Sequence, residues 1–187
     1  MNRRESIVRL ALLMGGTVVG PRLLRGAENA AAGTAHGASP AAVALLDEIG
    51  DTIIPPTDVP GAKAVNIGAF IARMVRDCYE PDQQAAFHQG VQELAAQFRA
   101  RHGREFVGAP ADLRTELLNE LNREQVEYTR VKVKGQLEHY FRLLKELTIL
   151  GYFSSEVGCT QAIRFIEVPG SYSGDVPYKP GDHVWFS

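Results

Sequence analysis

The 187-residue sequence lacks the short cysteine and histidine motifs that attach or hold common metal groups. It contains no C-x-x-C-H segment, so haem c is not expected to be attached to this chain. The histidines are His36, His88, His102, His139 and His183. They are scattered, without the short spacing that places two ligands on one helix face. A zinc or iron site would have to be assembled from distant segments by the fold, and none is predicted.

Nucleotide-binding loops are also missing. No G-x-G-x-x-G follows a predicted strand and no P-loop glycine-lysine pair occurs, so no nucleotide or flavin site is expected in this chain. When the first 32 residues are set aside, 15 basic and 20 acidic residues remain, a net charge of −5. A mildly acidic body without a basic stripe is poorly suited to neutralise phosphates, so nucleic acid is not an expected partner.

Two groups of polar residues could carry chemistry, but each has a simpler structural interpretation. His139 beside Glu138, with the serine pair at 154–155 downstream, could be drawn as a base and a nucleophile. We favour His139 as a residue of a polar face or a helix boundary. Asp47 and Asp51 are four positions apart and could act as paired carboxylates. We interpret them instead as the solvated face of the first helix.

The N-terminal segment MNRRESIVRLALLMGGTVVG has the features of an export signal. Arg3 and Arg4 precede an apolar stretch over residues 10–19, which is too short to span the roughly 30 Å core of a bilayer as a helix. Paired arginines are typical of the twin-arginine route, which carries proteins that are already folded. The alternative is a cytosolic helix that begins with basic residues. We predict a leader over residues 1–32 and a linker over residues 33–39.

Apolar residues at helical spacing predict five helices in the body of the chain. Ser39 can cap the first helix with Pro40 at its first position, and PPTDVPG ends it. The fifth helix is expected to be the longest. The apolar residues of the five stripes, in chain order, are Leu46, Ile49 and Ile53; Ile67, Phe70, Ile71, Met74, Val75 and Cys78; Phe87, Val91, Leu94, Ala95 and Phe98; Leu113, Leu117, Leu118 and Leu121; and Leu137, Tyr140, Phe141, Leu144, Leu147 and Thr148.

Strand-like alternation is absent before residue 160, although short strand-like pieces are expected at IRFIEV. The fold class is therefore predicted to be all-α, with about five or six helices packed around one core over residues 40–158. Residues 159–187 are predicted to form an extended C-terminal tail. Residues 166–185 contain three prolines, three glycines, two tyrosines and a tryptophan, which is too much turn chemistry for a helix.

The two cysteines, Cys78 and Cys159, leave three interpretations open. Cys78 lies on an apolar stripe and could be a small buried hydrophobic residue, which is the interpretation we favour. An exported protein meets an oxidising compartment, and a bond between the two cysteines would stabilise the fold by roughly 4 to 5 kcal/mol in the chain-entropy model. Cys159 follows a glycine in a predicted turn and could instead pair with a cysteine on another chain.

The segments GYFSSEVG at 151–158 and RFIEVPG at 164–170 resemble two blocks of the family named after gluconate 2-dehydrogenase subunit 3. Those blocks are G-Y-[FY]-[ST]-S-E-x-G and R-[FY]-x-x-V-P-G. The twin-arginine leader and the segment IPPTDVPGA at 54–62 are similar to further family features in the same order. The resemblance therefore extends over nearly the whole chain.

The resemblance implies a non-catalytic subunit, not an enzyme. Such subunits accompany a large flavoprotein of the glucose-methanol-choline type that binds FAD and oxidises a sugar, sugar acid or polyol. Some of these complexes add a cytochrome c subunit. The leader of the small subunit is expected to carry both chains through the twin-arginine translocon to the periplasm, where the complex or an uncleaved leader can hold it at the membrane.

Within this interpretation, the aromatic and proline-rich end of the chain is expected to lie on the partner. The expected interface residues are Tyr152, Phe153, Phe165, Pro169, Tyr172, Tyr178 and Trp185. Two other classes of protein remain as alternatives. One is a free-standing periplasmic binding or structural protein whose tail folds back on its own helices, and the other is a small self-contained hydrolase or metal-dependent enzyme.

Overall fold

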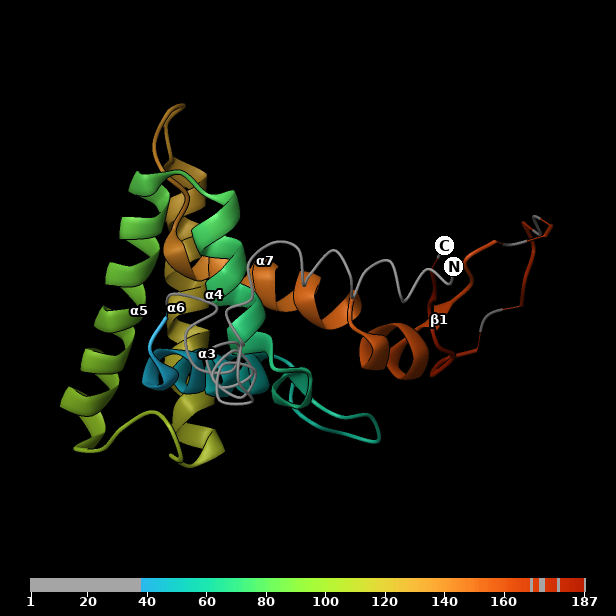
Figure 1. The fold of residues 1–187 in the computed structure, drawn as a ribbon, viewed down its shortest axis with the longest axis horizontal. Coiled ribbons are helices and arrows are strands. Elements are labelled where there is room, and N and C mark those ends of the chain that lie inside the picture. The colour runs from blue at the N-terminus through green and yellow to red at the C-terminus, as the bar shows by residue number, and fades with distance from the viewer. Residues whose placement is uncertain (1–37, 169, 172–173, 178, 187) are drawn as a thin grey trace, which may run out of the picture. The chain divides into compact units, whose positions relative to one another are not determined.

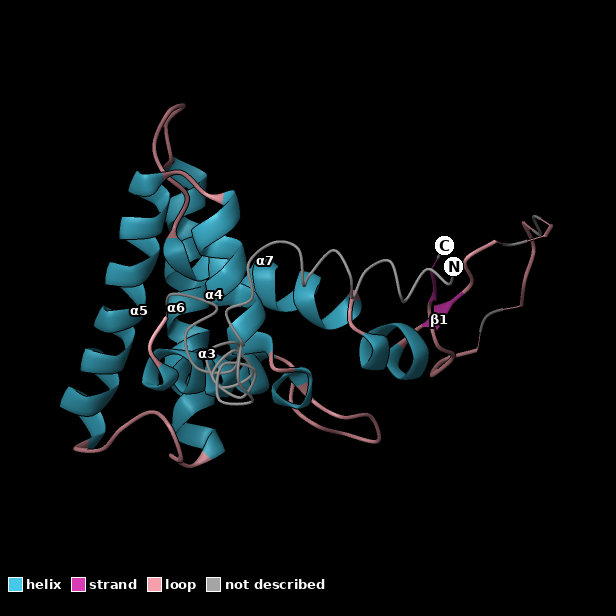
Figure 2. Ribbon diagram, viewed as in Figure 1, coloured by secondary structure: helices cyan, strands magenta, loops and turns pink. Residues whose placement is uncertain are grey.

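The computed structural model describes residues 38–168, 170–171, 174–177 and 179–186 (Figure 1). The predicted leader therefore lies outside the described residues. The elements, labelled as in Figure 1, are α3 (Pro40–Ile53), η1 (Ala62–Val65), α4 (Ile67–Cys78), α5 (Pro81–His102), α6 (Ala111–Val131), α7 (Tyr140–Phe153), η2 (Gly158–Ala162), β1 (Arg164–Phe165) and β2 (Trp185–Phe186). Figure 2 shows that helices dominate the described part of the chain, which confirms the all-α prediction.

The helix boundaries follow from local capping residues. The Ser39 hydroxyl accepts a hydrogen bond from the Ala42 amide at 3.2 Å, and Pro40 occupies the first turn of α3, as predicted. At the start of α5, Glu80 and Gln83 form a reciprocal capping box. Helices α3 and α5 therefore begin where a side chain satisfies amide groups that have no partner within the helix.

The acidic residues of α3 cap the two helical elements that follow it. Asp47 accepts a hydrogen bond from the Gly68 amide in the first turn of α4 at 2.7 Å, and Asp51 accepts one from the Lys63 amide of η1 at 3.3 Å. Burial raises the pKa of Asp47, and the hydrogen bond from Gly68 opposes that shift. The interpretation of this pair as a solvated helix face is therefore wrong, because both carboxylates bind backbone amides.

The core is built from large apolar side chains of the five described α-helices, α3 to α7, and of the α5–α6 loop. Helix α3 packs on α4, and α7 contacts α3, α4, α5 and α6. Figure 1 shows α7 crossing α4. A Cβ atom at Gly90 would lie 2.1 Å from Cγ of Tyr140, so α5 and α7 approach each other more closely than any larger residue would permit. The largest fully buried side chains are Phe87, Phe98, Phe106, Phe141, Ile49, Ile67, Ile71, Leu94, Leu117, Leu144, Leu147 and Val75.

A buried carboxylate joins three elements of the core. Glu48 on α3 forms ion pairs with Arg114 on α6 and with Lys63 of η1, the latter at 2.6 Å. The side chains of Glu48 and Arg114 are only 9% and 12% exposed, whereas Lys63 is 54% exposed. Sequence patterns do not reveal this cluster, because its members are separated by up to 66 positions.

The fifth predicted helix is shorter than expected. Helix α7 has 14 residues, whereas α5 has 22 and is longer, and Leu137 lies before α7 rather than within it. A turn at residues 133–136 precedes it, closed by the bond from the Gln136 amide to the Val133 carbonyl, with Gly135 at φ 95°. His139 then caps the helix, so the helix cannot begin earlier than Tyr140.

After α7 the described chain forms a short π-helix and two short strands instead of α-helices. The π-helix η2 is followed by β1, which pairs in parallel with β2 so that Arg164 is opposite Trp185. The predicted strand-like piece at IRFIEV is thus confirmed at two residues. None of the described helices is long and apolar enough to cross a bilayer.

Candidate partner-binding surface

Helix α7 has one side in the core and another that is apolar but exposed. Its buried side includes Phe141 and Leu144. On the exposed side, Ile149, Leu150 and Phe153 are 43%, 51% and 38% exposed. Residues three and four positions apart are neighbours on a helix surface, so Phe153 lies beside both Leu150 and Ile149, and the three form one apolar patch, here called the α7 patch. Adjacent exposed apolar residues of this kind mark candidate interaction surfaces.

The segment GYFSSEVG anchors the end of α7 to the segment IPPTDVPGA. A Cβ atom at Gly151 would lie 2.5 Å from side-chain atoms of both Ile67 and Phe70, so this glycine lets α7 pack closely against α4. The Tyr152 hydroxyl donates a hydrogen bond of 2.7 Å to the Pro60 carbonyl, 92 positions away. These two motifs are therefore in direct contact, and together they position the α7 patch.

The turn after α7 is held by one serine. The Ser155 hydroxyl donates to the Tyr152 carbonyl at 2.6 Å and accepts from the Gly158 amide at 3.1 Å. It thereby satisfies one group at the end of α7 and one at the start of η2. The SSEVG part of the motif has a structural role in ending α7.

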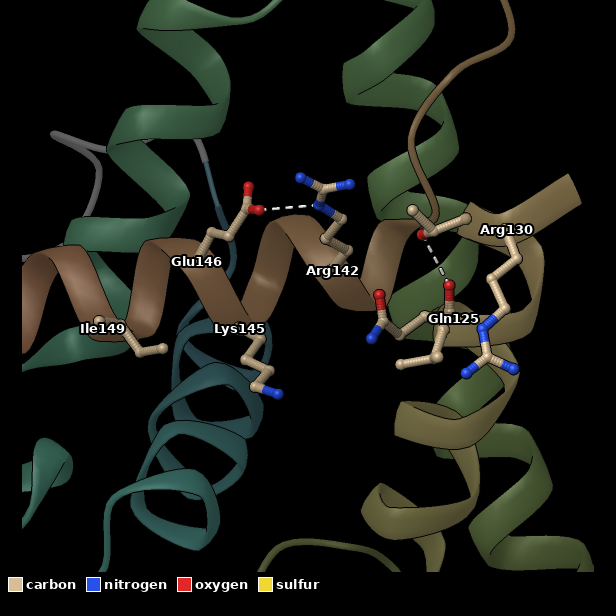
Figure 3. A pocket seen from close by; sticks show the side chains of 8 residues that line it. Gln125, Arg130, Arg142, Lys145, Glu146 and Ile149 are labelled. Atoms are coloured by element: carbon tan, nitrogen blue, oxygen red, sulfur yellow. Dashed lines mark hydrogen bonds and ion pairs between the residues drawn. The ribbon is translucent and has the colours of Figure 1, made fainter. Parts of the chain in front are cut away.

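A groove of about 390 Å³ lies between the second half of α6 and α7 (Figure 3). Val126 and Ile149 give it exposed apolar surface. The remaining lining is polar, and Figure 3 shows Lys145 and Glu146 on α7 and Gln125 and Arg130 on α6. The groove is lined by Gln125, Val126, Thr129, Arg130, Arg142, Lys145, Glu146 and Ile149.

The charged side chains of this groove differ in their partners. Within the groove, Arg142 donates to Glu146 at 2.8 Å. Arg130 pairs with Glu127 on its own helix at 2.7 Å. Lys145 instead donates to the neutral amide oxygen of Asn122 at 2.9 Å. Lys145 is therefore the groove cation that no described carboxylate compensates.

The residues expected at the partner interface differ in exposure, and only some of them are described. Tyr152 lies in the core of this chain and offers a partner almost no surface, contrary to the expectation for this side chain. The side chains of Phe153 and Phe165 are exposed. Trp185 belongs to β2, but its side chain is not described. The remaining predicted residues lie outside the described part of the chain: Arg3 and Arg4 of the export signal, and Pro169, Tyr172 and Tyr178 of the tail.

His139 is a helix cap, as favoured from the sequence. Its Nδ1 accepts a hydrogen bond from the Phe141 amide at 3.3 Å. Burial lowers the pKa of His139, and Glu124, 3.8 Å from its Nε2, opposes that shift. The serine pair lies at the other end of the 14-residue helix, roughly 20 Å away at 1.5 Å per residue. The base and the serines therefore do not meet.

Both cysteines have free thiols in this structure. Cys78 is exposed at the end of α4, so its interpretation as a buried hydrophobic residue is wrong. The Cys159 thiol donates to the Phe153 carbonyl at 3.0 Å. Disulfide pairing of either residue stays a prediction. Within the described residues, no group of three or more histidine, cysteine or acidic side chains could hold a metal ion.

Comparison with known proteins identifies the family. Residues 40–170, which run from the start of α3 to beyond β1, match the protein family described as gluconate 2-dehydrogenase subunit 3. A search of curated proteins and a search of solved structures each returned no match. The matched range covers well over half of the sequence and includes both motifs that meet at Tyr152 and Pro60. The chain therefore belongs to the gluconate 2-dehydrogenase subunit 3 family.

Proposed function

We propose that this chain is the non-catalytic small subunit of a periplasmic, FAD-dependent dehydrogenase that oxidises a sugar or a polyol. Its family is named for a subunit of a dehydrogenase, which supports an accessory role in such a complex. FAD belongs to a catalytic subunit of the glucose-methanol-choline type. A cytochrome c subunit is a candidate third member that accepts the electrons.

The observation that carries this proposal is the α7 patch. Ile149, Leu150 and Phe153 leave apolar area in contact with water on a helix whose other side is fully packed. Covering apolar surface is favourable by about 25 cal/mol per Å² removed from water. A partner that covers this patch would therefore gain binding free energy there. The family motif that ends α7 places the patch beside the start of the C-terminal tail.

The tail supplies further anchors in this proposal. Tyrosine and tryptophan contribute large contact areas and a polar group, and they are enriched among residues that dominate binding energy. Tyr172, Tyr178 and Trp185 are assigned this role. Truncation after Glu167 should weaken capture of the catalytic subunit without loss of helical circular dichroism. Full retention through a wash series would exclude the tail as an interface.

The second part of the proposal is that this chain brings the export signal. Arg3 and Arg4 open a leader of the kind used for folded cargo. The catalytic subunit folds around FAD in the cytoplasm, binds this chain and is exported with it. Replacing both arginines by lysine (R3K/R4K) should leave both subunits in the cytoplasm. Normal periplasmic dehydrogenase activity in that variant would contradict the shared signal.

The decisive test is co-expression of this chain, tagged, with the large open reading frame beside its gene. A yellow complex that contains both chains should purify on the tag, with an absorption spectrum of bound flavin. If the tagged chain purifies alone as a stable monomer, the free-standing helical protein is the better interpretation. Turnover of a substrate by the tagged chain without flavin would instead support the self-contained enzyme.

A further inference from the structure

The groove between α6 and α7 continues into the α7 patch. Ile149 belongs to both, because it lines the groove and begins the patch. Val126 on α6 adds a second exposed apolar side chain on the opposite side of the groove. A volume of about 390 Å³ accommodates a few side chains rather than a whole domain. This shape fits one projecting element of a partner.

The charge of the groove is opposite to that of the chain body. Its lining contains three cations, Arg130, Arg142 and Lys145, against the single carboxylate of Glu146. Arg142 is engaged by Glu146 and by Glu138. The pair of Arg130 with Glu127 is well exposed and therefore weak, so Arg130 can change partner at low cost.

Lys145 gives the strongest indication of the ligand. Its ammonium group is fixed at 2.9 Å from a neutral amide oxygen, so its charge is held in place without being neutralised. A carboxylate brought to the groove would gain a charge-assisted hydrogen bond without breaking an existing ion pair of Lys145. The exposed Val126 and Ile149 lie beside this lysine. Together, the apolar side chains and the uncompensated charge favour an occupant that has an apolar face with an acidic side chain next to it.

Two occupants from this chain itself are disfavoured by charge. The leader carries five arginines and two glutamates in its first 32 residues and would be repelled by the groove cations. A second copy would form a symmetric interface in which the same patch meets itself. Lys145 and Arg130 of one copy would then approach the same cations of the other copy. These charges favour a different chain as the occupant.

We propose that the groove binds an acidic amphipathic helix of the flavoprotein subunit. Helix-in-groove binding places an apolar side chain of the helix between Val126 and Ile149 and a carboxylate of the next turn on Lys145. This inference rests on the proposed function, since it names the contact through which the catalytic subunit is held. The groove lies in the helical domain, so this contact with the catalytic subunit is separate from the contacts proposed for the C-terminal tail.

Two matched pairs of variants test the site in the full chain. Lys145→Glu reverses the groove charge, and Lys134→Glu makes the same change on an exposed lysine that does not line the groove. Ile149→Ser removes apolar surface from the groove, and Val133→Ser does so at an exposed valine outside it. Each variant is co-expressed with the flavoprotein from the adjacent open reading frame. Capture on the tag is then measured by flavin absorbance across a salt series.

Each groove variant should weaken capture by about tenfold, while its control stays at the wild-type value. Added salt should weaken wild-type capture more than capture by Lys145→Glu, because the lost contact is electrostatic. Circular dichroism checks that the helices are intact. If Lys145→Glu is poorly folded, Arg130→Glu replaces it, since the Arg130 side chain is 69% exposed and contributes little to packing.

The outcomes separate this inference from the proposed function. If the wild-type chain captures no flavoprotein, the proposed function fails. If the wild-type chain and both groove variants capture it equally, the function stands and the groove is not the site. An equal loss in the control variants would show a nonspecific charge or solubility effect and would also overturn the inference. A wild-type dimer that Ile149→Ser converts to a monomer would assign the groove to a second copy instead.

Discussion

Replacing Glu48 by glutamine removes the charge that joins α3, α6 and η1. Glutamine keeps the shape of the side chain but leaves the Arg114 guanidinium without an anionic partner in the core. Arg114 has no evident alternative, because its Nε is already buried without a hydrogen-bond partner among the described residues. Lys63 is half exposed and can turn to water. The loss of stability in Glu48→Gln is therefore determined by the uncompensated charge of Arg114.

The expected loss of stability is large. Removing one partner of a buried ion pair costs about 3–5 kcal/mol, because the other charge stays buried and uncompensated. For a chain of this size each kcal/mol lowers the melting temperature by about 2–4 °C, so Glu48→Gln should lower it by about 6–20 °C. Urea unfolding of the full chain at neutral pH, followed by far-UV circular dichroism, measures the difference in free energy of unfolding.

The control is Glu127→Gln, which removes one partner of the exposed pair with Arg130. Glu127→Gln should lower the free energy of unfolding by less than about 1 kcal/mol. Equal stability of the two variants would refute the argument that Glu48 compensates a buried charge. Replacing both partners by apolar residues, Glu48→Leu with Arg114→Met, should recover much of the loss, because no charge is then left in the core.

Three further predictions concern the packing and capping of α7. Burial holds the pKa of His139 below its usual 6.5, so the unfolded chain binds the proton more tightly than the folded chain. The free energy of unfolding should therefore fall as the pH falls below about 6.5. In His139→Asn, which keeps a capping acceptor, the urea midpoint should lose this pH dependence. Tyr152→Phe removes the hydrogen bond to the Pro60 carbonyl, so it should lower the free energy of unfolding by about 1 kcal/mol and speed amide hydrogen exchange near Pro60. Unchanged exchange would contradict the anchoring role of Tyr152. Gly90→Ala should lower the free energy of unfolding, measured with urea, by about 1–3 kcal/mol, because the added Cβ atom would overlap the Tyr140 ring. A neutral effect would show that the ring can move aside.

The helices could be predicted from sequence where their signals are local. The stripe from Ile67 to Cys78 and the Ser39–Pro40 cap depend on residues a few positions apart, and both elements formed as expected. The predicted length of α7 is wrong, because Leu137 continues the apolar spacing whereas the turn at 133–136 and the cap at His139 make the helix begin only at Tyr140.

The candidate site was harder to predict, because aromatic residues do not show which way they point. The motif predicts Tyr152 at an interface, whereas Leu144, Thr148 and Tyr152 continue the buried spacing of α7. That spacing was the signal that could have placed it in the core. The groove cations and the Glu48 cluster could not be found in this way, because they depend on side chains from different helices.

The position of α7 in the chain has a consequence for the order of synthesis. Helix α7 contacts each of α3, α4, α5 and α6, yet it is the last of the five to leave the ribosome. A nascent chain that lacks it has no closed core, and its apolar helix faces are open to aggregation and proteolysis. Ile149, Leu150 and Phe153 lie on this same helix. A chain unfinished before α7 would therefore lack both its central packing element and the surface proposed to receive the catalytic subunit.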